Sequence, residues 1–148
     1  MQLNRQTDYA LRALIFLGVQ QHLCTIDDIA VRFNIAREHL VKIIGKLAKL
    51  NYITATRGKG GGLKLNPETR QVLLSEIVKH FEPTFQPIDC EGLACPLNGV
   101  CRLSKILCEA SHAFLSTLGK YTLDDILPKT NDEQALIAKK LNIKRECD

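Results

Sequence analysis

A chain of 148 residues, 45% of them hydrophobic, can bury one proper core but is too short for two full domains. No run of apolar residues approaches the roughly eighteen that a membrane span requires, and the first residues do not have the pattern of an export signal. We therefore expect one compact unit with appendages, located in the cytoplasm and without a membrane partner.

Positive charge is concentrated in the first half of the chain, although the net charge is only +4. Residues 32–64 hold eight lysine and arginine side chains against a single acid, whereas residues 83–148 hold eight basic and nine acidic side chains. This distribution favours a polyanionic partner for the first half. A solvated basic face is the alternative for such a run considered alone.

Three helices are predicted in the first fifty residues. Apolar spacing of three and four residues predicts a helix capped by Thr7 and ending near Gln21, and a shorter one capped by Thr25 and ending at Asn34. A third helix is predicted over residues 36–50, with one apolar and one basic side. Two helices joined by a tight turn, the second basic on its outer face, form the helix-turn-helix pattern.

The outer side of the third helix supplies candidate contacts to DNA. A helix about 10–12 Å across fits the major groove of double-stranded DNA, so outward side chains there can meet phosphates and base edges. We expect Arg37, His39 and Lys42 to contact bases, because they lie near the start of the helix, and Lys46 and Lys49 to contact phosphate. Ordinary solvation is the alternative for these cations.

A β-hairpin is predicted directly after the third helix, with strands at 52–56 and 63–65. Its glycine-rich turn joins two strands and lacks the Gly-x-x-x-x-Gly-Lys-Ser/Thr order of a nucleotide phosphate loop. We interpret it as a wing, whose glycines let the backbone approach DNA while Arg57 and Lys59 reach the minor groove. A flexible hairpin tip without a function is the alternative.

The second half begins with a predicted helix over residues 73–81, followed by an extended path that Pro83 and Pro87 enforce. Helix is predicted to resume over residues 96–100. A long helix is then predicted over 101–118, with an apolar face wide enough to serve both the core and a dimer.

The chain is predicted to end in a short helical turn and a polar tail. Thr122, followed three residues later by Asp125, can cap the short turn through Leu127. The residues from 129 onward are polar and mixed in charge, so we expect a flexible tail whose last dozen residues are mobile.

Three cysteines form the most specific chemical motif of the chain. Cys90, Cys95 and Cys101 make a Cys-x4-Cys-x5-Cys array on a loop that contains glycine and proline. Cytoplasmic thiols are kept reduced, so metal binding or redox chemistry is a better explanation than disulfides. Soft thiolates suit an iron–sulfur cluster or zinc, and the cluster is favoured because structural zinc ligands are usually spaced more tightly and in pairs. Three unliganded thiols remain the alternative.

The other cysteines are not expected to bind the metal. Cys108 lies seven residues beyond Cys101 in continuous helix, about 10 Å along the axis, which is too far for comfortable co-ligation. His112 is farther still. Cys24 and Cys147 lie outside the array and are given no function. A thiol redox enzyme is a rival hypothesis, but no Cys-x-x-Cys occurs in the chain.

Several motifs together resemble the iron–sulfur winged-helix transcriptional repressors, over residues 1 to about 128. They are the opening Met-Gln-Leu-Asn-Arg-Gln-Thr-Asp-Tyr-Ala-Leu-Arg, the wing Arg-Gly-Lys-Gly-Gly-Gly, the array from Asp89 to Pro96 with Cys101-Arg102-Leu103, and Tyr121-Thr122-Leu123-Asp124-Asp125. The chain resembles the nitric-oxide-sensing branch more than the cluster-assembly branch. The latter takes its fourth ligand from a histidine three residues after the third cysteine, where this chain has Ser104.

The resemblance implies a homodimeric repressor that binds a pseudo-palindromic operator and carries a 4Fe-4S or 2Fe-2S cluster. It implies that nitric oxide is the signal that releases DNA, and that Asp8 from the partner chain is the fourth ligand beside the three cysteines. An acid placed favourably in the first turn of a helix is the other interpretation of Asp8. A regulator of cluster supply or redox stress is an alternative in the same family, and a zinc-binding regulator is a weaker one.

The expected fold is therefore mainly α. Residues 1–82 would form a winged helix-turn-helix domain and residues 83–100 a Cys-rich cluster-binding loop. Residues 101–128 would form a long C-terminal dimerisation helix with a short final helix, and residues 129–148 the polar tail. We expect a regulator and not an enzyme.

Overall fold

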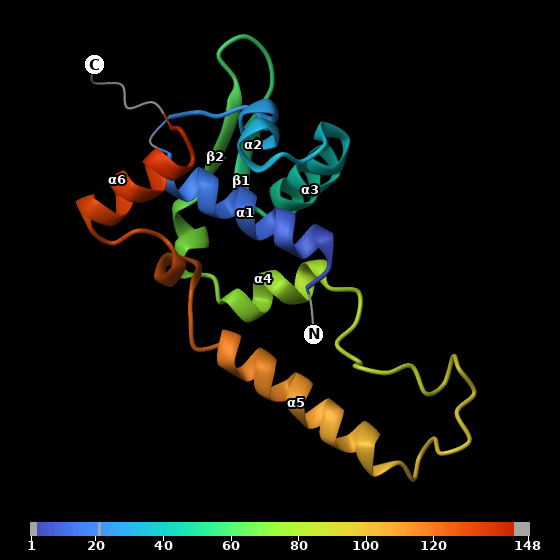
Figure 1. Ribbon diagram of the computed structural model, residues 1–148. Coiled ribbons are helices and arrows are strands. Elements are labelled where there is room, and N and C mark those ends of the chain that lie inside the picture. The colour runs from blue at the N-terminus through green and yellow to red at the C-terminus, as the bar shows by residue number, and fades with distance from the viewer. Residues whose placement is uncertain (1–2, 21, 144–148) are drawn as a thin grey trace.

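A computed structural model describes residues 3–20 and 22–143 of the chain, which are mainly helical (Figure 1). The elements in chain order are α1 (Arg5–Val19), α2 (Ile26–Phe33), α3 (Arg37–Lys49), β1 (Ile53–Thr56), β2 (Gly62–Leu65), the 3₁₀ helix η1 (Pro67–Gln71), α4 (Leu74–Phe81), α5 (Arg102–Leu118), the 3₁₀ helix η2 (Leu123–Ile126) and α6 (Asn131–Lys140). The predicted mainly α, winged helix-turn-helix fold is confirmed.

The helix-turn-helix consists of α2 and α3, which pack on α1. Thr25 caps α2 as predicted: its hydroxyl accepts a hydrogen bond from the backbone N–H of Asp28, and the Asp28 carboxylate accepts one from the backbone N–H of Thr25. Asn34 ends α2 in the left-handed conformation, with φ of 52°, which turns the chain toward α3. The apolar side of α3 is buried in the core, so its polar side faces outward.

The wing is a two-stranded antiparallel hairpin, as predicted, in which Ile53 pairs with Leu65 and Thr56 with Gly62. Its second strand is also tied to the segment before α2. The backbone N–H of Leu63 donates to the carbonyl of Cys24 at 2.7 Å, and the N–H of Cys24 donates to the carbonyl of Leu63 at 3.1 Å. The base of the wing is therefore fixed to the helix-turn-helix, while its turn projects beyond α2 and α3 (Figure 1).

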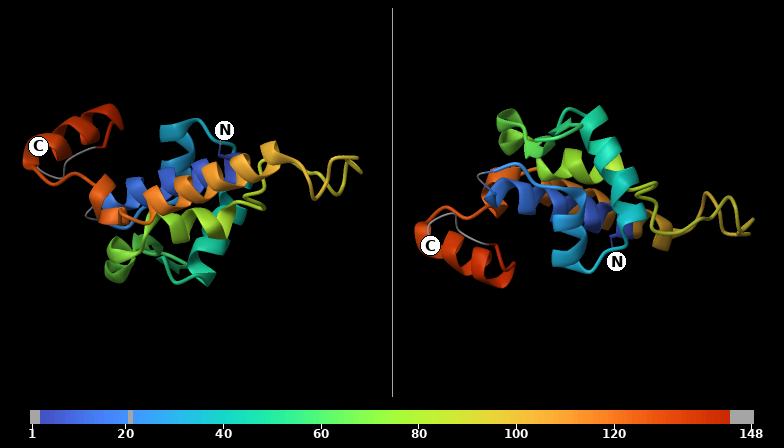
Figure 2. Two further views of the ribbon diagram at one scale, coloured as in Figure 1. Left: turned by 90° about the horizontal axis from the view of Figure 1, so that it is seen from below. Right: turned by 90° about the horizontal axis from the view of Figure 1, so that it is seen from above.

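The head of the molecule consists of α1 to α4 together with the wing. A long loop and α5 extend away from this head. The loop leaves the end of α4 and returns at the start of α5, and both views of Figure 2 show it projecting beyond the helices. A hydrogen bond holds it to α5, because the hydroxyl of the buried Ser111 donates to the carbonyl oxygen of Phe85 at 2.6 Å. The predicted helix over residues 96–100 is wrong. This segment consists of turns, with Gly99 at a φ of +84°.

The cap of α1 was also predicted wrongly. Asn4 is the N-cap, and its side-chain oxygen accepts the backbone N–H of Thr7 at 3.0 Å. Thr7 lies inside the helix and is fully buried, and within the described part of the chain its hydroxyl is the one buried side-chain polar atom without a partner. The helix begins one turn earlier than predicted because Asn4 supplies the oxygen that its first N–H groups need.

Part of the predicted flexible tail is helical. Residues 131–140 form α6, which opens with a capping box between Thr130 and Glu133. Ala138 is buried, and Leu141 and Ile143 pack against the core. The polar composition of this segment did not indicate a helix, but α6 forms and packs against α1. The mobility predicted for the end of the chain lies partly outside the described residues, which stop at 143.

The predicted cap of the short final turn is confirmed: Thr122 and Asp125 form a capping box at the start of η2. Among the described residues, no helix combines the length and the apolar character needed to cross a membrane.

Candidate nucleic-acid interface and metal centre

The outer side of α3 presents several exposed polar side chains. Arg37, His39 and Lys42 are all exposed on it, as predicted. Arg37 is engaged within the chain, because its Nε lies 2.8 Å from a carboxylate oxygen of Asp27 in the first turn of α2. This pair is more than half exposed on both sides, so water screens it and it contributes little to stability. Arg37 can therefore exchange Asp27 for a phosphate or a base at small cost.

Lys46 points to a different part of the molecule from the other α3 cations. Its ammonium donates a hydrogen bond to the backbone carbonyl of His80 and lies 4.8 Å from the centre of the Phe81 ring. Both residues are at the C-terminal end of α4, where the helix dipole favours a cation. Lys46 was expected to contact phosphate, but in this structure it connects α3 to α4.

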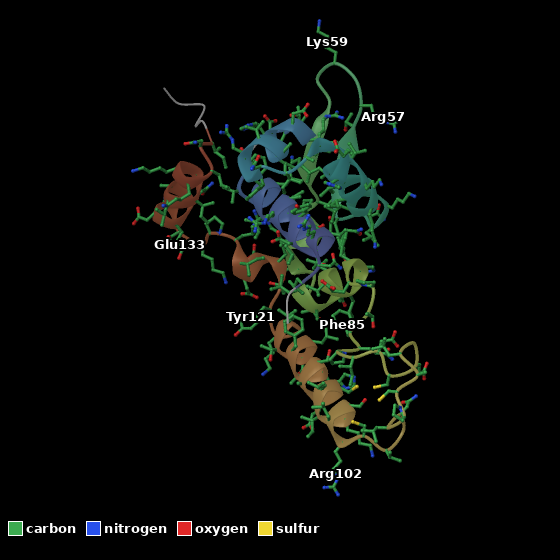
Figure 3. All side chains as sticks on the ribbon, turned by 45° about the vertical axis from the view of Figure 1, so that its right-hand side comes forward. Arg57, Lys59, Phe85, Arg102, Tyr121 and Glu133 are labelled. Carbon is green, nitrogen blue, oxygen red and sulfur yellow. The ribbon has the colours of Figure 1, made fainter. Side chains whose placement is uncertain are left out.

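The wing carries two exposed cations at its turn. Figure 3 shows Lys59 at the tip of the hairpin and Arg57 on its side, both pointing away from the protein. Gly58 and Gly60 have φ of 97° and 83°, a conformation that a side chain would strain, which explains glycine at these two positions. In the part of the chain that the structure describes, Arg57 and Lys59 have no side-chain hydrogen bond or ion pair, so both are available to a ligand.

The three array cysteines are free thiols, each partly buried. The backbone N–H of Cys95 donates to the carbonyl of Cys90 at 3.0 Å, and Cys101 stands at the N-terminal end of α5. In the view of Figure 3, sulfur atoms gather on the inner side of the loop next to α5. Within residues 3–20 and 22–143, however, no three His, Cys, Asp or Glu side chains are close enough to form a metal site. The donor chemistry fits a thiophilic metal group, and the loop would have to close around it.

The turn between the first two array cysteines is closed by a hydrogen bond from Gly92. The backbone N–H of Gly92 donates to the Asp89 carboxylate at 2.7 Å. A Cβ at position 92 would lie 2.2 Å from the other carboxylate oxygen, so a larger residue would displace Asp89. The loop therefore has a locally defined turn next to the thiols.

Asp8 does not join the cysteines of its own chain. It lies in the first turn of α1, and Arg12 Nε is 2.9 Å from both of its carboxylate oxygens. The Asp8 side chain is 42% exposed, so it can be reached from outside. Arg12 in turn lies over the Phe33 ring, 5.7 Å from its centre. If Asp8 binds a metal group, the group must belong to another chain or the loop must move.

The remaining cysteines differ in their surroundings. Cys24 is buried and pairs with Leu63 at the edge of the wing, and burial raises the pKa of its thiol to about 11, with a smaller contribution from the charge of Asp28. Such a thiol stays protonated at neutral pH and is a poor metal ligand. Cys108 is partly buried on α5, and Cys147 lies outside the described residues.

A connection between α1 and the cysteine loop was missed in the sequence. The backbone N–H of Asn4 donates to one carboxylate oxygen of Glu82 at 2.9 Å, and its side-chain amide donates to the other at 3.1 Å. The same amide donates to the carbonyl of Phe81 at 2.9 Å. The start of the helix that carries Asp8 is thus fixed to the residue where the loop begins. An asparagine before a helix is a recognisable cap signal, but its partners 77 and 78 residues away are not.

Comparison with known proteins identifies similar transcriptional regulators. A model of the family described as "Rrf2: Iron-dependent Transcriptional regulator" matches residues 3–129. The "HTH-type transcriptional regulator NsrR" of Geobacillus kaustophilus is 41% identical over 132 residues, covering 86% of this chain and 90% of the relative. The Bacillus subtilis protein of the same name is 36% identical over 145 residues, covering 95% of this chain and 99% of the relative.

Two solved structures have a similar fold. "The Structure of CymR (YrzC) the Global Cysteine Regulator of B. subtilis" aligns with a TM-score of 0.70 at 19% identity, covering 88% of this chain and 99% of the other. "T. potens IscR" aligns with a TM-score of 0.66 at 19% identity, covering 85% of each chain. At this identity the likeness concerns the fold alone.

Proposed function

The chain belongs to the Rrf2 family of iron-dependent transcriptional regulators, and on that premise we propose that it is a cytoplasmic, homodimeric repressor that binds operator DNA and releases it in response to nitric oxide. The observation that carries the DNA-binding part is the winged helix-turn-helix itself, in which exposed cations lie on the outer side of α3 and at the turn of the wing. The nitric-oxide part follows the resemblance of the chain to the nitric-oxide-sensing branch of the family.

The DNA contacts that we propose are Arg37, His39, Lys42, Lys49, Arg57 and Lys59. In this arrangement α3 enters the major groove, and the wing follows the adjacent backbone into the minor groove. The sequence predicts a phosphate contact for Lys46. Because its ammonium is engaged at the end of α4, we assign it to positioning α3 instead.

The homodimer that we propose is formed through α5. This helix exposes Leu103 and Ile106, which are 58% and 61% exposed. Apolar side chains on one face of a 17-residue helix support a helix-to-helix contact with a second copy. A symmetric dimer would present two α3 helices to two half-sites of a pseudo-palindromic operator.

The ligands that we propose for an iron–sulfur cluster are Cys90, Cys95 and Cys101 of one chain and Asp8 of the other. When bound, the cluster would supply a reactive iron that nitric oxide attacks. The role of this chain's own residues is to couple that site to the head. To reach a cluster, Asp8 must leave Arg12, and both side chains of this pair are nearly half exposed, so the exchange costs little.

The coupling would run through α1. A ligating Asp8 would fix α1 of one subunit to the cysteine loop of the other, and Asn4 already fixes α1 to Glu82, where the loop of its own subunit starts. Loss of the cluster would return Asp8 to Arg12 and release the head from the partner's loop. The two α3 helices would then lose the separation that the operator requires.

The test is anaerobic purification, followed by iron and sulfide analysis, absorbance spectra and DNA binding during a nitric-oxide titration. The proposal expects iron and sulfide in the dimer, specific DNA binding, and release of DNA by nitric oxide. A cluster that is insensitive to nitric oxide but responds to iron or oxidants would favour a regulator of cluster supply or redox stress. A colourless zinc protein would contradict the cluster.

A further inference from the structure

The outer side of α3 contains a glycine that the fold does not require. Gly45 lies inside the 13-residue helix and is exposed. A Cβ at this position would meet nothing within 4 Å, and its φ is not positive. Glycine inside a helix is less stable than alanine because it loses more conformational freedom on folding. The folded protein alone would therefore be more stable with alanine at position 45.

Other glycines of the head have a structural reason. In α1, a Cβ on Gly18 would lie 2.6 Å from a methyl carbon of Leu127, so packing requires the glycine. In the wing, Gly58 and Gly60 have positive φ. Neither explanation applies to Gly45, so the reason for this glycine is to be sought outside the chain.

The position of Gly45 on the helix indicates what it faces. The buried residues of α3 are Leu40, Ile43, Ile44 and Leu47. At about 100° per residue, Gly45 lies nearly opposite this buried side, on the same outward line as Lys42 and Lys49. Val41, one turn earlier, is next to it and is 44% exposed. A side chain on a helix covers the turn before it, so the missing side chain of Gly45 leaves the surface beside Val41 open.

The surface formed by Val41 and Gly45 is thus uncharged, and lysines border it. The lysine side chains fit a polyanion, which makes duplex DNA the occupant that the charges favour. The apolar group that DNA offers in the major groove is the C5-methyl of thymine.

We infer that Val41 and Gly45 determine operator specificity: Gly45 lets the backbone of α3 approach the floor of the major groove, and Val41 contacts a thymine methyl there. This inference rests on the proposed DNA-binding function and adds the base that this part of the helix reads. Arg37, His39 and Lys42 would hold the helix in the groove, while the contact of Val41 requires that position 45 carries no side chain.

The first experiment separates folding from binding. Wild-type protein, purified anaerobically and at full length, selects duplexes from a random DNA pool, and its affinity for the selected DNA is compared with that of Gly45→Ala. We expect the variant to melt about 3 °C higher, because alanine is the better helix residue. We expect its affinity for the selected DNA to fall tenfold or more, with unchanged affinity for a random duplex as the matched control.

The second experiment changes the DNA by one methyl group. Each thymine of the selected duplex is replaced in turn by deoxyuridine, and binding of wild type and Val41→Ala is measured. We expect a several-fold loss for wild type at one thymine in each half-site and no loss there for Val41→Ala. Equal affinity of Gly45→Ala and wild type for the selected DNA, or indifference of wild type to every deoxyuridine, overturns the inference and leaves the proposed function standing. Failure of wild type to select any sequence overturns the proposed function itself.

Discussion

Lys46 in α3 and His80 at the end of α4 are joined by a hydrogen bond from the lysine ammonium to the histidine's backbone carbonyl. The same ammonium lies over the Phe81 ring. The next residue, Glu82, holds the N-cap of α1 through two hydrogen bonds from Asn4. The C-terminal end of α4 is therefore a junction of three parts: the helix proposed to enter DNA, the helix that carries Asp8, and the start of the cysteine loop.

The junction predicts that Lys46→Ala loosens α3 without removing a phosphate contact. We expect a loss of stability of about 1 kcal/mol, since a cation–π contact and a hydrogen bond at a helix end are removed. Operator affinity should fall, with an unchanged dependence on salt. Thermal melting and binding at several salt concentrations measure both effects.

Lys49→Ala is the matched control for Lys46→Ala. Lys49 lies in the last turn of the same helix, is exposed, and has no side-chain hydrogen bond or ion pair among the residues described. We expect it to leave melting unchanged and to reduce the salt slope by about one unit, as for a phosphate contact. If Lys46→Ala instead behaves like Lys49→Ala, Lys46 contacts phosphate and the positioning role is wrong.

The wing predicts that Arg57→Ala weakens operator binding by about 1–3 kcal/mol and leaves folding and metal content unchanged. Arg57 projects from the hairpin and has no side-chain hydrogen bond or ion pair among the described residues, so we expect its removal to act on the complex. Lys120→Ala, which removes one positive charge from the exposed segment after α5, is the control for net charge. Equal losses in both variants would mean that only the overall charge matters.

Features that depend on residues close together in the sequence could be predicted, and features that depend on residues far apart in it could not. Thr25 and the glycines of the wing act on residues a few positions away, so α2 and the hairpin were predicted correctly. The direction of Lys46 depends on His80, 34 residues away, and no local pattern contains that contact. The helix α6 was not predicted, although its capping box of Thr130 and Glu133 is present in the sequence, because its polar composition is also typical of a flexible tail.

Only the chemistry of the candidate metal centre was predictable from the sequence. The spacing of Cys90, Cys95 and Cys101 identifies three thiols on one loop, but that loop has no regular structure, so no periodicity fixes how they approach one another. Asp8 was named through a family resemblance, and its partner in this chain is Arg12. In the proposed site the Asp8 carboxylate and the three thiols come from different subunits. The spacing of residues in one chain does not predict a contact between two chains.

The proposed ligand set predicts which cysteines are needed for metal binding and which are not. Cys90→Ala, Cys95→Ala or Cys101→Ala should each abolish the visible chromophore and bound iron of anaerobically purified protein. Cys108→Ala, a change of the same size on neighbouring α5, should leave both in place, and so should Cys24→Ala and Cys147→Ala. Iron, sulfide and absorbance are measured together with the helical content. A folded Cys108→Ala without chromophore would add Cys108 to the ligands.

Burial of Cys24 predicts a pH effect on stability at the alkaline end. Its folded-state pKa of about 11 lies above the usual 9.0, so the folded protein binds this proton more tightly than the unfolded chain does. The resulting stabilisation is present below pH 9 and is lost as pH rises from about 9 to 11. We expect Cys24 to resist alkylation at pH 8 while the array thiols of metal-free protein react, as mass spectrometry of the labelled peptides would show. Ready labelling of Cys24 in folded protein would contradict its burial.

The last prediction concerns how Asp8 would couple the cluster to DNA. A carboxylate is a harder ligand than a thiolate and holds iron less firmly, so it leaves one position that a small ligand can attack first. Among the residues that the structure describes, the Asp8 carboxylate is held by Arg12, in an exposed i, i+4 pair that contributes only about 0.3–0.5 kcal/mol. We expect Asp8→Ala to keep a cluster on three cysteines, but one that is less stable and only weakly linked to operator affinity. Asp8→Cys should hold the cluster more firmly and blunt the response to nitric oxide.

Arg12→Ala is the matched control, because it breaks the same ion pair and leaves the carboxylate in place. If Asp8 is a ligand, this variant should retain the cluster and the response, since Asp8 no longer has to leave Arg12 to reach iron. If Asp8 only supports the first turn of α1, Asp8→Ala should cost about 0.3–1 kcal/mol of stability and nothing else. Operator affinity and absorbance are followed through one anaerobic nitric-oxide titration for all four proteins. Release of DNA by wild type and Asp8→Ala over the same range of nitric-oxide concentration, with the same spectra, would show that Asp8 is not a ligand. The proposed coupling between the cysteine loop of one subunit and the head of the other would then be wrong, because no bond would join them.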